Sequence, residues 1–325
     1  METPNMVMEN ANQTLSQKKV VVIGGGVIGA SWTALFLANG MRVVVNDPQA
    51  GIDKTVRNYV VQATPALTAL GHDMTSVLGN LSFEADLAKA VADADFVQEN
   101  GPERADFKAA LWVTAERFAP AHCLFFSSSS GIQASVQSVQ MKEPGRLIIG
   151  HPFNPPHLLP LVEVVPSPQT PRELIDASLA FYRALGKHPL ELRKEIDGFV
   201  ANRLQSAIFR ECVYLVSQGV ITVADLDSVV TNSLGIRWAT NGPFLSFHLG
   251  GGAGGFPHFV DHLAPGMETR WSEQLKSTVH FDEATKKLLV EQIESGYGKQ
   301  SIAELAEARD QKEIAIIKGT KNLSR

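Results

Sequence analysis

Short apolar runs alternate with longer amphipathic stretches over the first 190 residues of the chain. A run such as residues 19–23, Lys-Val-Val-Val-Ile, is typical of a buried parallel strand, while apolar positions three and four apart indicate a helix packed on a sheet. The pattern predicts strands at residues 19–23, 42–47, 94–98, 123–126 and 147–151, and helices at 27–39, from about 49, at 104–118 and from about 132. We expect Pro65 to interrupt the second helix. This alternation predicts an α/β fold with a doubly wound parallel sheet.

The pattern changes near residue 196. An apolar run at 161–165, a helix at 171–185 and a strand at 188–192 continue the α/β alternation, but from Asp197 onward only helical patterns occur. They cover residues 198–217, 223–233, 244–249, 256–263, 283–294 and 301–318. We therefore predict a mobile lead-in at residues 1–18, a sheet domain at 19–196 and an all-α helical domain at 197–325.

A glycine turn follows the first predicted strand. Gly24, Gly26 and Gly29 have the G-x-G-x-x-G spacing, and Val27 and Ile28 begin the next helix. The first glycine permits a tight turn, the second lets the backbone approach a pyrophosphate, and the third allows close helix-sheet packing. The free N–H groups that begin the helix then face the phosphates. Alone, the motif is a weak signal.

The second predicted strand supplies the other half of a dinucleotide site. It ends in Asp47, 18 residues after Gly29. A carboxylate at this point accepts hydrogen bonds from the adenosine ribose hydroxyls and repels a 2′-phosphate. The two halves together predict a Rossmann-type domain that binds NAD in preference to NADP, and they count against a glycine turn without a ligand.

Residues 147–165 combine two apolar runs with a proline-rich loop. The prolines allow neither a helix nor a central strand, so the chain must turn rigidly after His151. Glu163 lies in the second run between two valines, where a buried carboxylate requires a charged or hydrogen-bonded partner. If that partner is His151, one ring nitrogen is held and the other is free to take a proton, as in a general acid/base pair. A core histidine and a strand glutamate that never meet explain this stretch equally well.

Two polar loops lie where predicted strands end. The first contains Glu103 and leads to a helix with Lys108; these charges are expected either to contact a ligand or to be solvated at the surface. The second loop is a run of serines that includes Ser130. It lacks the glycine two residues before a serine that a nucleophile elbow requires. A hydroxyl here is expected to donate to a substrate oxygen or to cap a helix.

The helical domain contains two further candidates. Asn202 lies among apolar residues in the first turn of a predicted helix, so it either fills a packing niche or points into a cleft. Arg237 lies in a predicted loop and has a side chain shaped to grip a carboxylate, although a salt bridge is nearly as good an interpretation. His258 and His262 lie four apart on a helix, but no third ligand is evident and we expect no metal site.

Composition narrows the class of protein. The chain has 325 residues, of which 44% are hydrophobic and 19% charged, as expected for a globular protein of two domains. A net charge of -5 gives no reason to expect nucleic acid or an anionic membrane as partner. Two cysteines, Cys123 and Cys212, cannot build a disulfide framework, and the polar first residues lack the apolar segment of a signal peptide. We expect a cytoplasmic protein without a membrane span.

These motifs resemble the 3-hydroxyacyl-CoA dehydrogenase superfamily nearly from end to end, starting at about Lys19. The resemblance is carried by the glycine turn with Asp47, by Glu103 after a proline with Lys108, by the serine run, and by the segments His-Pro-Phe-Asn-Pro, Leu-Val-Glu-Val and Gly-Phe-Val-Ala-Asn-Arg. It implies NAD as the cofactor and a homodimer formed largely through the helical domain.

The resemblance also implies roles for individual residues. His151 would be the catalytic base, and Glu163 would orient it. Ser130 and Asn202 would contact the substrate oxygen, with Ser130 close to the cofactor as well. The implied cleft residues near the nicotinamide are Glu103 and Lys108.

Within the superfamily the chain is most similar to the branch that acts on free hydroxy acids, the group of λ-crystallin, L-gulonate 3-dehydrogenase and L-carnitine dehydrogenase. The segment Val-Pro-Ser-Pro-Gln-Thr resembles the λ-crystallin side, and residues 244–251 resemble carnitine dehydrogenases. Residues 51–81 contain only Lys54 and Arg57 as Lys or Arg, whereas the phosphates of coenzyme A require cations. A small carboxylate would instead be bound by Arg237.

We therefore predict an NAD-dependent L-3-hydroxy acid dehydrogenase that acts on a 3-hydroxy carboxylate such as L-gulonate or L-carnitine. For a quaternary ammonium substrate, Phe153, Trp238, Phe244 and Phe247 could supply a cation-π surface, although such side chains are more often core aromatics. Two alternatives remain open, a 3-hydroxyacyl-CoA dehydrogenase and a non-catalytic structural protein like a crystallin.

Overall fold

The structure is a computed structural model, and it describes residues 15–321. The chain divides into two compact units, Met1–Asn202 and Arg203–Arg325, which we call the sheet unit and the helical unit. Most of the expected lead-in, residues 1–14, falls outside the described residues. Leu15 is already buried in the core of the sheet unit, and Lys18 pairs with Asp95. The fold of the sheet unit therefore includes the residues from Leu15 onward.

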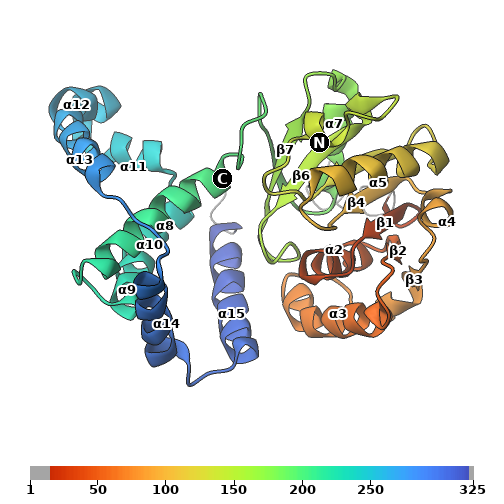
Figure 1. Cartoon of the computed structure of the whole chain (residues 1–325), viewed down its shortest axis with the longest axis horizontal. Coiled ribbons are helices and arrows are strands. Elements are labelled where there is room, and N and C mark those ends of the chain that lie inside the picture. Colours follow the sequence, from red (N-terminus) through yellow and green to blue (C-terminus); the bar gives the residue numbers. More distant parts are fainter. Residues whose placement is uncertain (1–14, 322–325) are drawn as a thin grey trace. The chain divides into compact units, whose positions relative to one another are not determined.

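One eight-stranded sheet organises the sheet unit, in the order β3-β2-β1-β4-β5-β6-β7-β8 (Figure 1). The strands are β1 Lys19–Ile23, β2 Arg42–Asn46, β3 Leu81–Phe83, β4 Phe96–Glu99, β5 Leu124–Ser127, β6 Leu147–Pro152, β7 Leu161–Pro166 and β8 His188–Glu191. All neighbours are parallel except β6 and β7, which are antiparallel. Residues 153–160 between these two strands are too few for the crossover that a parallel pair needs.

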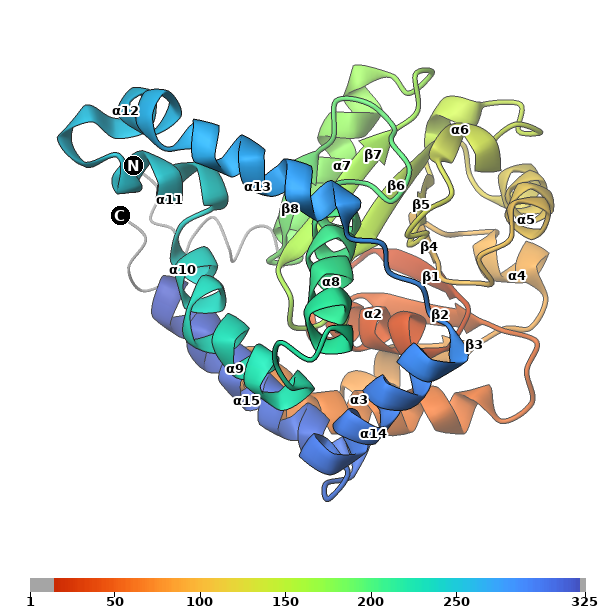
Figure 2. The same cartoon turned by 60° about the vertical axis from the view of Figure 1, so that its left-hand side comes forward.

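Helices cover both faces of this sheet, which confirms the predicted doubly wound α/β fold. They are α2 Val27–Ala38, α3 Ile52–Ala69, α4 Leu87–Val91, α5 Ala105–Phe118, α6 Ala134–Gln137 and α7 Arg172–Ala184. Figure 1 and Figure 2 both show α2 and α3 side by side. In β1, Val20 and Val22 face the core formed with α2, α3 and α7, while Val21 and Ile23 face the core formed with α4 and α5. Because both faces are buried, the strand is apolar throughout.

Helix α3 corrects the expectation for Pro65. The helix continues from Ile52 to Ala69 with Pro65 inside it. A proline removes one backbone hydrogen bond, but Pro65 and Val61, whose carbonyl loses its N–H partner, lie on the exposed face where water can bond to that carbonyl. Ala63 and Leu67 are buried on the opposite face. Packing of that face therefore maintains the helix.

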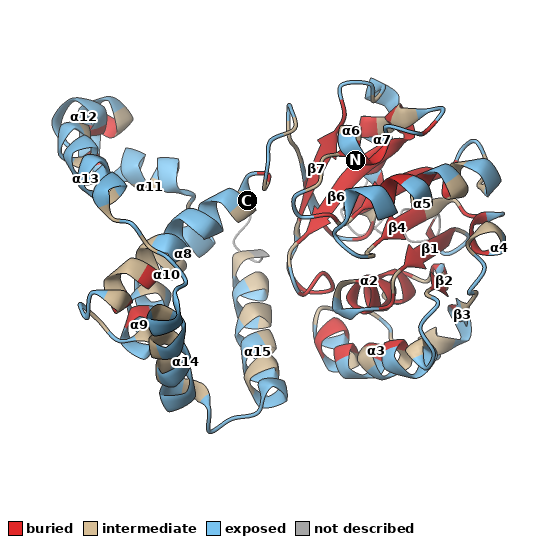
Figure 3. Cartoon of the chain, in the orientation of Figure 1, coloured by how far each residue is buried: buried red, intermediate tan, exposed pale blue. Residues whose placement is uncertain are grey.

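The helical unit is built of helices throughout, as predicted. Its helices are α8 Ala201–Ser217, which begins at the end of the sheet unit, α9 Val223–Asn232, α10 Leu234–Thr240, α11 Pro243–Gly250, α12 Gly255–His262, α13 Ala264–Lys276, α14 Glu283–Tyr297 and α15 Ile302–Lys321. Helices α10 and α13 were not predicted. Figure 3 shows the helical unit mostly exposed, whereas the strands of the sheet unit are buried. No helix among the described residues is long and apolar enough to cross a membrane.

Candidate active site

The glycine turn after β1 fits a bound pyrophosphate. Gly24 has a φ of 84°, and a Cβ atom there would lie 2.8 Å from the carbonyl oxygen of Asn100. A Cβ atom on Gly29 would lie 1.8 Å from the carbonyl oxygen of Gly24, whereas one on Gly26 would meet nothing within 4 Å. Helix α2 has neither a side-chain cap nor an acidic residue in its first turn. Its first N–H groups, which include those of Val27 and Ile28, are therefore available to an anion.

Asp47 lies beside this turn, directly after β2. Its Oδ2 accepts a hydrogen bond from the backbone N–H of Gly25 at 2.8 Å, and its Oδ1 accepts one from Gln49 at 2.8 Å. The two bonds fix the carboxylate at the edge of the dinucleotide turn. This is the position from which a carboxylate can also accept ribose hydroxyls, so the residues present fit a bound NAD.

His151 and Glu163 meet, which excludes the interpretation that they lie apart. They are register partners in the antiparallel pair of β6 and β7, and Nδ1 of His151 lies 2.8 Å from Oε2 of Glu163. The side chains are only 6% and 3% exposed. Gly150 has to be a glycine, because a Cβ atom there would lie 1.9 Å from the hydroxyl oxygen of Tyr182. The Tyr182 ring thus packs against the backbone just before the histidine.

The second carboxylate oxygen of Glu163 is also bonded. Oε1 accepts the backbone N–H of Val200 at 3.0 Å and that of Ala201 at 2.9 Å, at the start of α8. Burial raises the pKa of Glu163, but the His151 hydrogen bond and the two N–H donors outweigh it and hold the pKa below its ordinary value. Glu163 is therefore ionised, and it holds Nδ1 of His151 as a donor. Nε2 is left for proton exchange with a ligand.

Ser130 and Asn202 contact one another rather than lying apart. The side-chain Nδ2 of Asn202, in the first turn of α8, donates to the carbonyl oxygen of Ser130 at 3.3 Å. Ser130 is exposed, at the end of the loop that follows β5. The same loop is held from the other side by Glu103, whose Oε1 accepts the N–H of Ser130 at 3.1 Å and the hydroxyl of Ser129 at 2.5 Å. Glu103 and Asn202 together fix the path of the serine loop.

Lys108 is buried and paired, not a solvated surface charge. Its Nζ lies 2.6 and 2.7 Å from the two carboxylate oxygens of Glu99 and 3.5 Å from Glu103. Glu99 also accepts the Ser127 hydroxyl at 2.7 Å. Burial raises the pKa of Glu103, but the Ser129 hydroxyl and the Lys108 charge keep it below its ordinary value.

Glu99 is the site residue that sequence reasoning missed. It is fully buried at the last position of β4, where the other polar residue, Gln98, is fully buried as well. An acid that ends an otherwise buried strand was the available signal, because such a carboxylate needs a cation nearby. The lysine nine residues later supplies it.

Arg237 lies in helix α10, which corrects its assignment to a loop. Its side chain is exposed in the helical unit.

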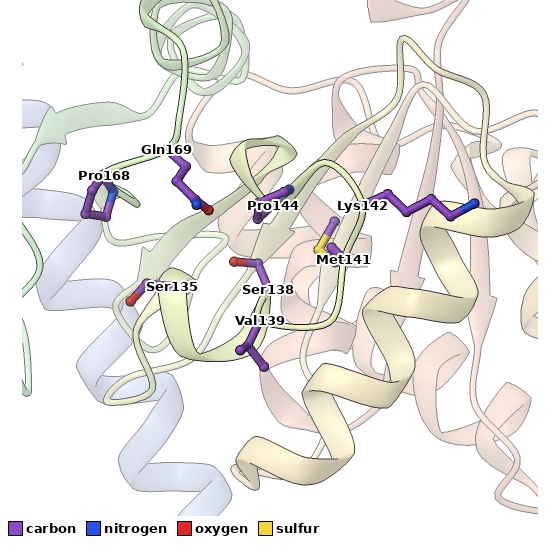
Figure 4. Close-up of a pocket in the computed structure, with 8 residues that line it drawn as sticks. All are labelled: Ser135, Ser138, Val139, Met141, Lys142, Pro144, Pro168 and Gln169. Atoms are coloured by element: carbon purple, nitrogen blue, oxygen red, sulfur yellow. The ribbon is translucent and has the colours of Figure 1, made fainter.

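A hollow of about 670 Å³ on the sheet unit is lined by none of the predicted site residues (Figure 4). Lys142 is the single cation in its lining, and the hollow has no part in the arrangement described above. Among residues 15–321, no group of three or more His, Cys, Asp or Glu side chains could hold a metal ion.

The carboxyl edge of one doubly wound sheet carries both a dinucleotide turn and a buried histidine–glutamate pair. Together they define a Rossmann-type, NAD-dependent oxidoreductase. Comparison with known families gives the same class. The NAD-binding domain of 3-hydroxyacyl-CoA dehydrogenase matches residues 19–196, and the C-terminal domain of that family matches residues 198–292. The chain belongs to the 3-hydroxyacyl-CoA dehydrogenase family, and NAD is its cofactor.

Individual relatives are similar over nearly their whole length. An L-carnitine dehydrogenase of Nocardiopsis dassonvillei is 39% identical, over 98% of this chain and 96% of the relative. A 3-hydroxyacyl-CoA dehydrogenase of Gibberella moniliformis is 40% identical, over 90% and 92% of the two chains. A crystal structure of 5-formyl-3-hydroxy-2-methylpyridine 4-carboxylic acid 5-dehydrogenase, an NAD⁺-dependent dismutase, superposes with a TM-score of 0.73 at 26% identity and covers 94% of this chain and 98% of that one.

Proposed function

We propose that the protein is an NAD-dependent dehydrogenase that oxidises a free L-3-hydroxy carboxylate, and that L-carnitine is its first candidate substrate. The His151–Glu163 contact is the observation that carries the reaction type. L-carnitine dehydrogenases from several bacteria, 36–39% identical to this chain over 92% or more of its length, support the substrate. L-gulonate remains the second candidate within the free hydroxy acids.

His151 acts as the base in this mechanism. Its Nε2 takes the proton of the substrate hydroxyl, because Nδ1 is already held by Glu163. NAD⁺, which the glycine turn and Asp47 would hold, would supply the hydride acceptor for the carbon that carries this hydroxyl. Glu163 stabilises the imidazolium that forms, and Ser130 and Asn202 lie in the loop and helix turn where the substrate oxygen would be bound. In the reverse direction, the imidazolium returns the proton to the oxygen.

The basic residues of α3 favour a free acid over an acyl-CoA. The guanidinium of Arg57 lies over the ring of Phe83, 5.3 Å from its centroid. Lys54 is then the one remaining Lys or Arg of residues 51–81, and a single lysine is little to bind the phosphates of coenzyme A. In our proposal, Arg237 grips the carboxylate of the small substrate.

Phe153 is the candidate aromatic residue that lies in the sheet unit, in contact with the proposed base. Its ring meets the His151 ring edge-on, with 5.1 Å between the centroids. The other candidate rings lie in the helical unit, where Phe247 stacks on Phe259. A quaternary ammonium group beside Phe153 would gain a cation-π contact next to the catalytic base.

A substrate panel read at the NADH absorbance tests the proposal. L-carnitine, L-gulonate and a short 3-hydroxyacyl-CoA are each offered with NAD⁺ at equal concentrations. We expect NADH to form with a free hydroxy acid and L-carnitine to have the highest kcat/KM. Preference for the acyl-CoA would establish the second candidate function, which the 40% identical relative favours. No NADH with any substrate would favour the third candidate, a structural protein like λ-crystallin.

The cofactor preference depends on Asp47. In Asp47→Ala we expect weaker NAD binding and weaker discrimination against NADP, since the carboxylate that repels a 2′-phosphate is removed. Dissociation constants for both cofactors, measured by titration of the wild type and the variant, give the change in their ratio. An unchanged ratio would show that another residue selects the cofactor.

We also propose that a second copy of the chain covers part of the helical unit. The three clusters of buried hydrophobic residues found among residues 15–321 all lie in the sheet unit. The helical unit instead exposes large apolar side chains, including Leu204, Ile208, Phe209, Phe244, Leu249, Trp271 and Leu275. Apolar exposure of this kind marks an association surface. Sedimentation equilibrium is expected to give twice the chain mass, and a single-chain mass would refute the proposal.

A further inference from the structure

The last residues of the sheet unit adopt a backbone conformation that is rare outside glycine. Gly198 has a φ of 71°, and Phe199 follows it with a φ of 50°. Bulky residues seldom occupy this left-handed region, and they stay there only where the surroundings hold them. Phe199 is also completely buried. Its conformation therefore needs an explanation in terms of what the segment contacts.

The side chain of Phe199 packs beside the catalytic histidine. The centroids of the Phe199 and His151 rings are 5.4 Å apart. The same ring belongs to a small buried cluster with Ile149, Val165 and Ala134. Ile149 lies two residues before His151 on β6, so the phenylalanine braces the strand as well as the imidazole.

The backbone that follows Phe199 supplies the rest of the contact. The N–H groups of Val200 and Ala201 both point at Oε1 of Glu163. They lie at the start of the 17-residue helix α8, where the helix dipole adds positive charge. On the neighbouring strand β8, the register partner of Glu163 is Leu190, an apolar residue that brings no further charge to the carboxylate. The carboxylate is thus shared between one imidazole and one helix start.

We propose that residues 198–202 are a positioning element for proton transfer, in which the conformation of Phe199 directs two N–H groups at Glu163 so that the proton taken from the substrate stays on His151. This inference rests on the proposed function, because it assigns a role to the segment in that same reaction. Without the two donors, the carboxylate would compete with the imidazole for the proton. The base would then lose the fixed tautomer that it needs for the next turnover.

Ala201→Pro removes one of the two donors and places the ring carbon Cδ where the N–H faced Oε1 of Glu163, so the carboxylate is displaced from the start of α8. Ala201 is the first residue of α8, a position where proline is well tolerated. The hydrogen bond that Ala201 donates to Glu163 is lost, and the one from Val200 to the same oxygen is weakened. We expect the acidic limb of the kcat/KM profile to move to higher pH by about one unit, since protonation of the pair becomes easier.

Glu283→Pro is the matched control. Glu283 is the first residue of α14, so the same backbone change is made in a helix that supplies none of the residues named above. The acidic limb should stay in place. An unmoved limb in Ala201→Pro, with wild-type circular dichroism, would overturn the proposal. Absence of NADH formation by the wild type would instead refute the proposed function.

Two variants of Phe199 test the conformation separately from the ring. Phe199→Gly removes the ring but suits a positive φ, whereas Phe199→Val removes the ring and disfavours that φ. We expect the acidic limb to move in the valine variant and to stay in the glycine variant. An acidic limb at the same pH in both variants would show that the backbone conformation has no such role.

A spectroscopic measurement is independent of turnover. The ¹⁵N chemical shifts of the His151 ring, assigned by comparison with His151→Gln, report which ring nitrogens carry protons. At pH values below the acidic limb, we expect two protonated nitrogens in the wild type. In Ala201→Pro, a larger share of neutral imidazole should persist because Glu163 holds part of the proton. Identical spectra in the two proteins would contradict the proposal.

Discussion

Two buried charge pairs lie at the carboxyl edge of the same sheet, and they differ in one chemical respect. Lys108 pairs with Glu99 at 2.6 Å, and His151 pairs with Glu163 at 2.8 Å. In both pairs the carboxylate accepts further donors, so neither acid is left with an unbonded oxygen. The basic partner in the first pair is a lysine amine, whereas in the second it is an imidazole, the side chain that proteins most often use to take up and release a proton.

A buried carboxylate paired with a basic side chain can therefore stabilise the fold or assist a reaction, depending on the basic partner. Lys108 bonds to Glu99 and lies within ion-pair distance of Glu103, which in turn bonds to the serine loop. Around His151, the same kind of carboxylate is placed against a group that can gain and lose a proton. We therefore expect the first pair to matter mainly for stability and for the shape of the loop, and the second mainly for turnover.

The largest expected effect is that of His151→Gln on turnover. Glutamine keeps a similar volume and can still bond to Glu163, but it cannot accept a proton. General base catalysis typically contributes about 10²–10⁴ in rate, so kcat should fall by about that factor. NAD binding, measured by titration, should remain close to wild type. High residual turnover would remove His151 from the mechanism.

Lys108→Met should have the next largest effect, and on stability. The change leaves Glu99 buried without its cation, and breaking a buried pair in this way typically costs about 3–5 kcal/mol. The free energy of unfolding, from urea denaturation, is the quantity to compare. Adding Glu99→Leu should restore much of the loss, because the unpaired charge is then removed. A single variant as stable as the wild type would contradict the comparison.

Lys187 is another buried lysine, and unlike Lys108 its contacts among the described residues include no carboxylate. Its Nζ donates to the carbonyl oxygens of Pro156 and Leu159, while burial lowers its pKa to about 7. Between pH 7 and pH 10 the unfolded chain therefore binds more protons at this residue than the folded chain does. The lysine's contribution to the free energy of unfolding should rise with pH, by about 1 kcal/mol for each unit.

Lys187→Met provides the reference for this slope. The variant lacks the titrating group, so its free energy of unfolding should rise less between pH 7 and pH 10 than that of the wild type. Urea denaturation at several pH values gives both slopes. Parallel slopes would show that Lys187 remains charged throughout, held by its two carbonyl acceptors.

The smallest effect is expected for an exposed pair close to Lys108. Arg104 bonds to Asp106 at 2.5 Å, with both side chains about two-thirds exposed. Water competes for both charges, and such surface pairs contribute little to stability. Arg104→Ala should leave the thermal unfolding midpoint unchanged within error. A clear fall would mean that burial is not what separates strong pairs from weak ones in this protein.

Much of this arrangement was predictable from the sequence because it follows from local patterns. The apolar strands, the glycine turn and Asp47 each depend on residues close together in the chain. The His151–Glu163 contact depended on a buried acid that needs a partner, and only the antiparallel register showed that the two side chains face each other.

The features that were missed depend on tertiary packing. The sequence around Glu99 contains another acid, Glu103, and does not tell which of the two is buried with Lys108. The φ of Phe199 has no sequence signal of its own, because a bulky residue seldom adopts this conformation and the contact with His151 appears only in the folded structure. The continuity of α3 through Pro65 also depends on tertiary packing, because packing of the opposite helix face outweighs the lost backbone hydrogen bond.

The antiparallel pairing of β6 and β7 has a practical consequence for engineering. Ladder bonds between the strands keep His151 opposite Glu163, so the placement of the two side chains does not depend on the hairpin tip at residues 153–160. That tip carries Phe153, whose ring contacts the His151 ring. Substitutions at this one position offer a route to altered substrate preference that leaves the histidine–glutamate pair in register.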